Sequence, residues 1–314
     1  MFAIRQYEFG PASNLLVEEV SDPEPAAGQV RITVAASGVH LVDTTIRKGG
    51  FGPVDFPMTP GREVAGVVTA LGADVEPEWL GRRVVAHLGQ ANGGYAELAV
   101  ANVSALHAVP DDVSFEAAVA MIGTGRTVVA VLDRAQLTKD DVVLVTSAAG
   151  GMGTLFVQEA RNVGARVIGL ASGAKLDLVV ENGADAAIDY TRPGWAEGVK
   201  DMTVVFDGVG GEVGAQALKT LGTGGRQIIY GWASGAMTPI STEALFANSL
   251  TATVALGPGM MRRGLRNLEE ESMAGLAGGR FVPLVNPPFA LKDAAKAHEA
   301  LESRAVVGKV VLKP

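Results

Sequence analysis

The apolar and polar positions divide the chain into two parts of different texture. In the second part, short apolar runs rich in Val and Ile alternate with stretches in which apolar residues recur at helical spacing. Apolar strands separated by helices are typical of a parallel sheet that is covered on both faces. The pattern therefore predicts a doubly wound α/β domain, with strands at residues 142–145, 166–170, 186–189, 203–207, 226–230 and 250–254.

The first part has short strands divided by turns rich in Gly and Pro, a texture typical of a compact and mostly antiparallel β domain. A helix is predicted from Ser114, with Glu116 in its first turn, and it leads into the second part. The strands predicted for this domain lie at residues 30–36, 64–68, 82–86 and 94–100.

The C-terminal residues are expected to rejoin the β domain and to leave a cleft between the two domains. Strands are predicted at 281–285 and 306–312, on either side of a helix at 292–301. The predicted domains are residues 1–118 with 258–314, and residues 119–257.

Composition narrows the classes of function. The chain has 314 residues, of which 48% are hydrophobic and 19% charged, and its net charge is −8. An acidic chain is a poor partner for nucleic acid or for an anionic membrane surface. The sequence has no cysteine, which excludes disulfides, thiolate chemistry and cysteine-ligated zinc. No apolar run reaches the length of a membrane span, so we expect a cytoplasmic enzyme.

A glycine-rich turn follows the first strand of the α/β domain. After the strand at 142–145 come Ala148, then Gly150, Gly151, Met152 and Gly153, and a helical stretch begins. Glycines let the backbone approach a pyrophosphate closely, and the helix N-terminus offers free N–H groups. The segment predicts a dinucleotide site. The alternative is a turn whose glycines only pack the helix against the sheet.

The end of the second strand indicates which dinucleotide binds. An NAD site usually carries Asp or Glu there to bond the ribose hydroxyls, but this sequence continues with Ser172 and Lys175. A hydroxyl and an ammonium suit a 2′-phosphate, which a carboxylate would repel. We therefore predict NADP(H) as the cofactor. Alternatively, Lys175 is a solvated helix residue and Ser172 its cap.

Several ordered motifs are similar to those of a known family. Residues 38–49, 60–68, 93–97, 148–153 and 308–312 resemble the zinc-independent quinone oxidoreductases of the medium-chain dehydrogenase/reductase superfamily, and the resemblance covers essentially the whole chain. It implies a GroES-like β domain, a Rossmann domain, and a homodimer formed by joining the edges of the nucleotide domains. It also adds Tyr190 as a second contact to the 2′-phosphate. Gly231 and Lys309 complete the predicted cofactor residues.

The same resemblance tests for catalytic zinc. The positions that hold zinc in the alcohol dehydrogenases of this superfamily correspond here to His40, Arg62 and Gly123. Gly123 has no ligand atom, and Arg62 places a fixed positive charge where the cation would lie. We therefore predict that no metal is bound.

Reduction of a carbonyl without metal requires hydrogen-bond donors for the developing oxyanion. The predicted catalytic residues are His40, Arg62 and, more remotely, Arg126. His40 stands where the family usually carries Asn, and an imidazole can donate a proton as well as a hydrogen bond. The alternatives are an ordinary loop histidine for His40 and, for Arg62, a salt bridge to Glu63 or Asp43. We also expect Asp43 and Arg47, four residues apart, to form a local ion pair.

The combined prediction is an NADPH-dependent, zinc-free reductase that transfers a hydride to a quinone or a related α,β-unsaturated carbonyl. A reductase of enones or 2-enoyl thioesters is the alternative enzyme. A carrier-bound thioester would need a basic patch, for which the chain offers only scattered residues such as Arg262, Arg263 and Arg266. An alternative of another class is a sensor or structural protein that binds NADPH without turnover.

Overall fold

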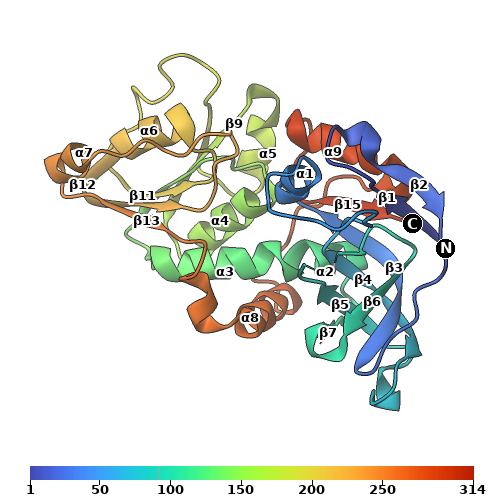
Figure 1. The fold of residues 1–314 in the computed structure, drawn as a ribbon. Helices are drawn as coiled ribbons and strands as arrows, with labels where there is room; N and C mark the ends of the chain where they lie inside the picture. Colours follow the sequence, from blue (N-terminus) through green and yellow to red (C-terminus); the bar gives the residue numbers. More distant parts are fainter. Residues whose placement is uncertain (91) are drawn as a thin grey trace. The chain divides into compact units, whose positions relative to one another are not determined.

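The chain forms two compact units in a computed structural model that describes residues 1–90 and 92–314 (Figure 1). The first unit contains residues 1–123 and 283–314, and the second contains residues 124–282. The return to the first unit therefore comes later than the predicted residue 258. The cause is a long helix that belongs to the second unit, where its Glu269 pairs with Arg126 at 2.5 Å.

The first unit is built on a mostly antiparallel sheet. Its seven strands follow the order β14-β15-β3-β4-β5-β7, with β6 also paired to β3, and only β14 and β15 run parallel. A second, antiparallel pair joins β1 (Phe2–Arg5) and β2 (Leu16–Glu19). The strands of the larger sheet are β3 (Gln29–Val39), β4 (Glu63–Leu71), β5 (Arg83–His87), β6 (Leu98–Asn102), β7 (Leu106–Ala108), β14 (Phe289–Ala290) and β15 (Val310–Lys313).

Alternation of side chains explains the core of the first unit. Val30, Ile32 and Val34 on β3 are buried with Val64 and Val68 of β4, while Arg31 and Thr33, which alternate with the buried residues of β3, are more exposed. The period of two turns one face of each strand toward the core. Its helices are α1 (Leu41–Arg47), α2 (Phe115–Ile122) and α9 (Ala294–Glu302). The helix predicted from Ser114 is α2, and Ser114 is its N-cap, since its hydroxyl accepts a hydrogen bond from the Ala117 N–H at 3.1 Å.

The second unit contains a six-stranded parallel sheet in the order β10-β9-β8-β11-β12-β13. Numbered within this unit, the order is 3-2-1-4-5-6, which is the Rossmann arrangement. The predicted fold is confirmed. The strands are β8 (Val142–Val145), β9 (Arg166–Ala171), β10 (Ala186–Asp189), β11 (Met202–Asp207), β12 (Leu221–Ile229) and β13 (Thr251–Val254).

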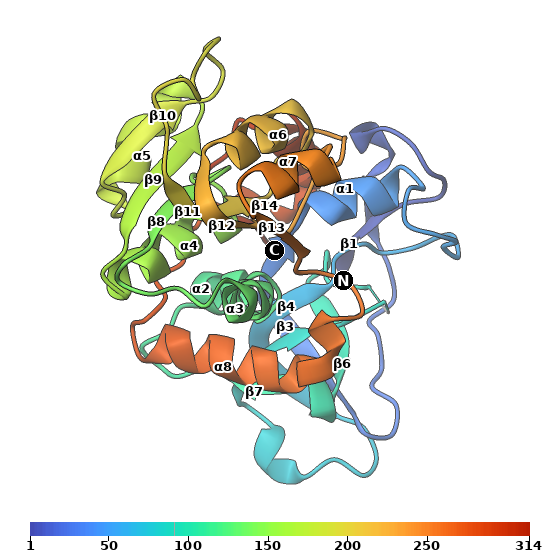
Figure 2. The same cartoon turned by 90° about the vertical axis from the view of Figure 1, so that its left-hand side faces the viewer.

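Helices cover both faces of this sheet. Figures 1 and 2 show α3 and α4 on one side and α6 on the other. Right-handed crossovers require this, because the connection from β8 to β9 and the one from β11 to β12 lead in opposite directions along the sheet. The helices are α3 (Thr124–Ala135), α4 (Gly151–Asn162), α5 (Leu176–Glu181), α6 (Gly211–Lys219), α7 (Thr242–Ala247) and α8 (Leu265–Ala277).

Some predicted elements differ from the structure. The strand expected at 281–285 is wrong, because only Val285 forms an isolated bridge, to Lys309. The strand expected at 94–100 begins later, at Leu98. The pattern did not predict β1, β2 or β7, whose short runs lack clear alternation. The remaining short elements are 3₁₀ turns: η1 (Ala12–Asn14), η2 (Pro77–Trp79), η3 (Val103–Ala105), η4 (Gly173–Lys175), η5 (Met260–Arg263) and η6 (Leu291–Asp293).

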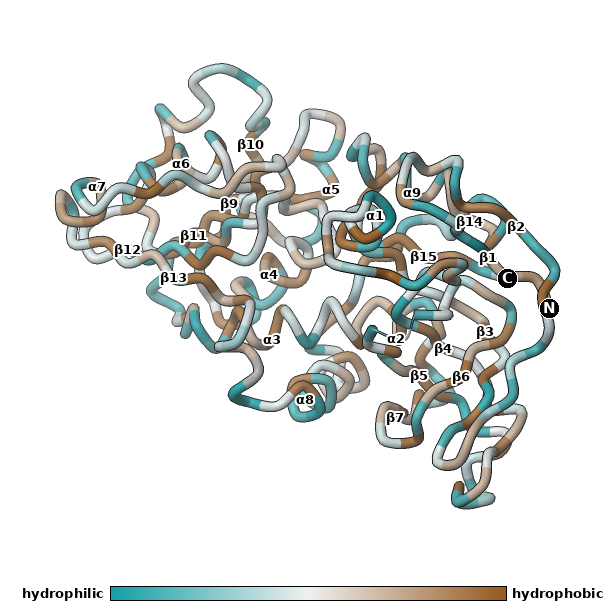
Figure 3. Tube along the Cα trace, in the orientation of Figure 1, coloured by the Kyte–Doolittle hydropathy of each residue, from teal (hydrophilic) through white to brown (hydrophobic). Residues whose placement is uncertain are grey.

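Apolar residues follow the strands of both sheets, as the brown segments of Figure 3 show. Within the described residues, none of the helices is by itself long and apolar enough to cross a membrane. Helices α2 and α3, which are separated by a bend, reach the length and apolarity of a membrane span only when they are taken together.

Candidate functional site

The predicted nucleotide turn lies at the carboxyl end of β8, next to β11, where the strand order of the sheet reverses. Ligands of open α/β sheets bind at such a point. The Ala148 N–H donates to the Leu170 carbonyl at 2.9 Å and so ties the turn to β9. A Cβ at Gly153 would lie 2.1 Å from the Ser147 carbonyl oxygen. Glycine at this position therefore lets α4 pack closely on the turn.

Helix α4 begins at Gly151, directly after this turn, with Gly150 as its extended N-cap. The first N–H groups of a helix have no partner within the helix, and the helix dipole favours negative charge at this end. Gly151, Met152 and Gly153 are the first three residues of α4. The turn can therefore hold a pyrophosphate, because its glycines leave room for close approach.

The predicted 2′-phosphate residues lie at the ends of β9 and β10. Ser172 follows β9 and precedes η4, which ends at Lys175, while the Tyr190 N–H donates to the Ala171 carbonyl at 3.3 Å. The structure also brings an acid to this place. A Cβ on Gly173 would lie 2.8 Å from Asp189 Oδ2, so this carboxylate of β10 sits beside η4. Sequence reasoning looked for an acid only at the end of the second strand and therefore missed Asp189, although it assigned the next residue, Tyr190, to the phosphate.

Asp189 is held as an anion. Its Oδ1 accepts hydrogen bonds from the Thr191 hydroxyl at 2.6 Å and from the Thr191 N–H at 3.0 Å. These bonds, and then the nearby charge of Arg192, lower the pKa of the Asp189 carboxyl. Arg192 Nε lies 3.5 Å from Asp189 Oδ2 and is largely exposed. Asp189, Lys175 and Arg192 therefore all lie at or just after the ends of β9 and β10, where the 2′-phosphate is predicted to bind.

Gly231 lies at the same edge of the sheet. A Cβ there would be 3.0 Å from the Gly208 carbonyl oxygen, which joins the ends of β12 and β11. Asp207, the last residue of β11, is fully buried and organises this region. Its carboxylate accepts hydrogen bonds from the N–H groups of Val209 and Gly210 and from the Gln227 amide. Sequence reasoning did not identify Asp207.

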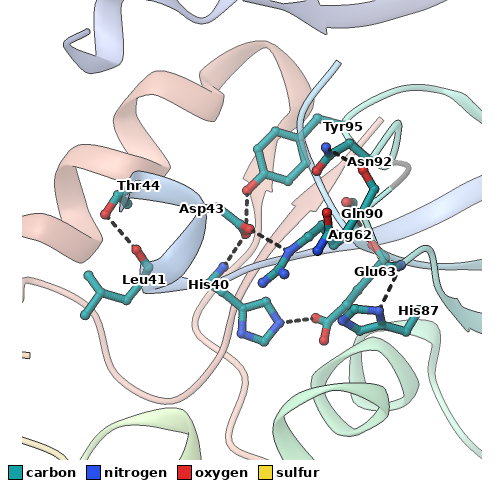
Figure 4. Close-up of polar contacts among 12 residues, drawn as sticks. His40, Leu41, Asp43, Thr44, Arg62, Glu63, His87, Gln90, Asn92 and Tyr95 are labelled. Carbon is teal, nitrogen blue, oxygen red and sulfur yellow. Dashed lines mark hydrogen bonds and ion pairs between the residues drawn. The ribbon is translucent and has the colours of Figure 1, made fainter. Parts of the chain in front are cut away.

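His40 and Arg62, the predicted catalytic residues of the first unit, both contact Asp43. His40 precedes α1, and its backbone N–H donates to Asp43 Oδ2 at 2.7 Å. Arg62 Nε lies 3.4 Å from Asp43 Oδ1. The salt bridge considered as the alternative for Arg62 is therefore present, with Asp43 as the partner (Figure 4).

The local ion pair expected between Asp43 and Arg47 is wrong. Arg47 pairs instead with Glu302, with Nη2 2.7 Å from Oε1, and its side chain is buried. The physical reason is the packing of α1 against α9, which supplies Glu302, while Asp43 faces Tyr95 and Arg62.

A buried carboxylate, Glu63, forms the centre of the site. Its Oε2 atom lies 2.6 Å from His40 Nε2 and 2.8 Å from Lys309 Nζ. Lys309 Nζ also lies 2.6 Å from His40 Nε2. The side chain of Glu63 is 0% exposed, that of Lys309 5% and that of His40 22%. We call these three residues the Glu63 cluster.

Charge and burial compete in this cluster. Burial alone would raise the pKa of the Glu63 carboxyl, but the charges of His40 and Lys309 hold that pKa well below its usual range. Burial lowers the pKa of the Lys309 ammonium, and Glu63 opposes this effect without cancelling it. Glu63 is therefore an anion, and Lys309 gives up its proton more easily than an exposed lysine does.

Two glycines make room for the carboxylate. A Cβ at Gly38 would lie 2.2 Å from Glu63 Oε2, and one at Gly123 would lie 1.8 Å from Oε1. No real side chain tolerates such distances. Glu63 was missed by sequence reasoning, although an acidic residue at the head of the apolar run 64–68 was a signal, since buried acids are rare unless paired.

A second buried chain of polar groups begins at Asp43. The Tyr95 hydroxyl donates to Asp43 Oδ2 at 3.2 Å and lies 3.1 Å from His298 Nε2. Because the hydroxyl gives its hydrogen to the carboxylate, it accepts one from His298 Nε2. Burial lowers the pKa of His298 to about 4. His298 is therefore a neutral packing residue.

The structure thus separates the predicted residues into three groups. His40 and Lys309 meet at Glu63, although Lys309 was assigned to the cofactor, and Arg62 joins them through Asp43. Arg126 belongs to the second unit, on α3, where Glu269 is its ion-pair partner. The remaining predicted cofactor residues lie at the carboxyl ends of the parallel strands: Ala148, Gly150, Gly151, Met152, Gly153, Ser172, Lys175, Tyr190 and Gly231.

Comparisons with known proteins cover the whole chain. Two families match, the alcohol dehydrogenase GroES-like domain over residues 26–111 and the zinc-binding dehydrogenases over residues 182–312. The quinone oxidoreductase of Salmonella typhimurium is 34% identical, and the match covers 99% of each chain.

Solved structures match equally well. The Escherichia coli quinone oxidoreductase complexed with NADPH superposes with a TM-score of 0.89 at 29% identity, covering all of both chains. A structure described as an NAD-dependent alcohol dehydrogenase superposes with a TM-score of 0.90 at 29% identity, again over all of both chains.

Proposed function

We propose a reductase function from the premise that this chain belongs to the quinone oxidoreductase branch of the medium-chain dehydrogenase/reductase superfamily. The protein transfers a hydride from NADPH to a quinone or a related α,β-unsaturated carbonyl. The observation that carries the proposal is the glycine turn between β8 and α4. It combines a free helix N-terminus with positions where a Cβ would collide, at the place where the sheet order reverses.

The turn fits the cofactor that the proposal needs. Gly150, Gly151 and Gly153 would lie against its pyrophosphate, while Ser172 and Lys175 would face the 2′-phosphate together with Tyr190. When bound, NADPH supplies the hydride. The chain's part is to hold the nucleotide through backbone N–H groups, which cost no side-chain ordering, and to neutralise its phosphates.

Two side chains of the first unit are proposed to act on the substrate oxygen. His40 can donate a hydrogen bond and a proton, and Arg62 supplies a positive charge that Asp43 holds in place. A single well-placed donor to an oxyanion is worth roughly 3 kcal/mol of the barrier. Arg126 is a weaker candidate, because its guanidinium is engaged by Glu269.

The residues do not fit zinc, although one matching family is described as zinc-binding dehydrogenases. At the corresponding positions, Arg62 is cationic and Gly123 has no donor atom. The nearby carboxylate of Glu63 is already neutralised by Lys309 at 2.8 Å. Among the described residues, no three His, Cys, Asp or Glu side chains are grouped closely enough to hold a metal ion. Zinc independence stays a prediction.

An enone is the second candidate substrate. His40 favours it, because reduction of an enone leaves an enolate that must be protonated. A thioester on a phosphorylated carrier is less suited, since Arg263 and Arg266 are paired with Asp133, Glu271 and Glu270.

The test is consumption of NADPH, followed by nicotinamide absorbance with a chelator present, against a simple quinone and a simple enone in parallel. We expect turnover of the quinone and a slower reaction with NADH. The faster acceptor decides between the two enzymes. Tight binding of NADPH without turnover of either acceptor would contradict the proposal and favour a non-catalytic NADPH-binding protein.

We also propose a homodimer in the cytoplasm. Strand β13 is an edge of the parallel sheet, and an unpaired edge strand can continue into a second copy. Val254 on this strand is 67% exposed and Phe246 on α7 is 90% exposed, so apolar side chains are available for such a contact. Sedimentation velocity tests the dimer, and a concentration-independent monomer would refute it.

A further inference from the structure

The fold of the second unit places an acid next to the position where the nucleotide site lacks one. Ala171 is the last residue of β9, where an NAD site carries the acid that bonds the ribose 2′-hydroxyl. In the parallel pairing of β10 with β9, Asp189 lies in register with Ala171, and Figure 2 shows the two strands side by side. Paired strands are about 4.8 Å apart. Asp189 is therefore one strand away from the position of the missing acid.

The two carboxylate oxygens of Asp189 have different surroundings. Oδ1 accepts both hydrogen bonds from Thr191, at 2.6 and 3.0 Å. Oδ2 faces Gly173, where an added Cβ would lie 2.8 Å from it. Glycine at position 173 therefore leaves Oδ2 uncovered on the side of the residues that follow β9. The Thr191 bonds also lower the pKa of Asp189, so its carboxylate is an anion and a hydrogen-bond acceptor at neutral pH.

We propose that Asp189 takes the place of the missing acid, so that this chain binds NADH as well as NADPH at one site. The proposal rests on the part of the proposed function that places a dinucleotide at the glycine turn. Asp189 Oδ2 would accept a hydrogen bond from the 2′-hydroxyl of the adenosine ribose of NADH. In NADPH a phosphate replaces that hydroxyl, and the carboxylate then has no hydrogen to accept.

Positive charges near Asp189 explain how both cofactors can use the same site. Arg192 Nε lies 3.5 Å from Asp189 Oδ2, and the Arg192 side chain is 79% exposed. This cation offsets part of the repulsion between the carboxylate and a 2′-phosphate. Lys175, at the end of η4, supplies a second positive charge after β9. The acid therefore serves the hydroxyl of NADH, and the cations serve the phosphate of NADPH.

The first test is calorimetric titration of Asp189→Asn with NADH and with NADPH. The Thr191 N–H keeps the amide oxygen of the variant on its own side, so the amide nitrogen replaces Oδ2. The charge-assisted bond to the ribose hydroxyl is then lost. We expect NADH binding to weaken about fivefold, the difference between a charged and a neutral hydrogen bond, while NADPH binding does not weaken.

Asp201→Asn is the matched control for that titration. It makes the same change of charge, but Asp201 is exposed and precedes β11, at the amino end of the parallel sheet and thus at the opposite edge from the nucleotide turn. Its φ of 59° suits asparagine as well as aspartate. We expect wild-type affinity for both cofactors in this variant. A loss of NADH binding equal to that in Asp189→Asn would assign the effect to net charge and overturn the proposal.

The second test removes the hydroxyl from the ligand instead of the acid from the protein. The probe is the analogue of NADH that carries 2′-deoxyadenosine, titrated into the wild-type protein and into Asp189→Asn. In the wild-type protein the analogue should bind about fivefold more weakly than NADH. In the variant the difference should be less than about twofold, because the two changes remove the same hydrogen bond.

The outcomes separate this proposal from the proposed function. Equal affinity of the wild-type protein for NADH and its deoxy analogue would overturn the role of Asp189, whatever the variant does. Wild-type protein that binds NADPH but not NADH would overturn it as well, and the proposed function would stand. Protein that binds neither nucleotide refutes both proposals. Binding of both cofactors with the expected pattern, but without turnover of any acceptor, refutes only the proposed function.

Discussion

The two units bring together their candidate residues by different physical means. In the second unit, the nucleotide turn is made of backbone groups and glycines that follow one another between β8 and α4. In the first unit, the Glu63 cluster is made of buried charges, and Lys309 lies 246 positions from Glu63 in the sequence. Steric fit governs the nucleotide turn, and the balance of charge against burial governs the Glu63 cluster.

This difference predicts that the Glu63 cluster is the more fragile of the two. Glu63→Gln keeps the shape and leaves the Lys309 ammonium buried without its counter-ion. Removing one partner of a buried pair typically costs about 3–5 kcal/mol. We expect a loss near the lower figure in the free energy of unfolding, measured with urea at pH 7, since Lys309 can shed its proton.

The double variant Glu63→Gln with Lys309→Met is the control for that measurement. With both charges removed, most of the stability should return, because no buried charge remains uncompensated. A double variant that is as unstable as the sum of the two single variants would show that the pair is not energetically coupled.

The first unit should also respond to acid. His298 has a pKa of about 4 when folded and an ordinary value of 6.5. The unfolded chain therefore binds the proton more tightly, so stability falls as the pH drops through this window. The shift corresponds to about 3 kcal/mol lost between pH 6.5 and pH 4. In His298→Gln this part of the loss should disappear from urea unfolding measured at several pH values. Identical pH slopes in the two proteins would contradict the assignment.

The second unit should respond to volume instead. In Gly153→Ala, the new Cβ would lie 2.1 Å from the backbone oxygen of Ser147, which cannot move away freely. Overpacking of this kind costs about 2 kcal/mol. We expect that loss in thermal or urea unfolding together with weaker binding of NADPH.

Gly198→Ala is the matched control in the same unit. Gly198 is exposed, and a Cβ there would meet nothing within 4 Å. Its stability and NADPH affinity should stay at the wild-type values. If both alanine variants behaved alike, glycine at position 153 would be replaceable and the close approach of α4 to the turn would not matter.

What the sequence could predict follows the same division. The strands of the parallel sheet and the turn from Ala148 to Gly153 are local patterns, and the predicted positions agree with the structure. The Glu63 cluster depends on contacts between distant segments, which periodicity does not encode. Lys309 was accordingly assigned to the cofactor from its motif alone. Asp189 was missed for a related reason, since it lies close to Gly173 only because β10 pairs with β9.

The smallest predicted effect concerns cofactor choice, where charge enters the second unit. Lys175→Ala should weaken NADPH binding about tenfold and spare NADH, because an ammonium bonded to a phosphate is worth about 1.5 kcal/mol even when partly exposed. Asp189→Asn removes a negative charge from the same place and should strengthen NADPH binding by less than about threefold, since Arg192 already compensates part of that charge. Calorimetric titration of both cofactors measures each change. If Lys175→Ala weakened NADPH and NADH equally, Lys175 would be a structural residue, and the choice between the cofactors would depend on Ser172, Tyr190 and Arg192.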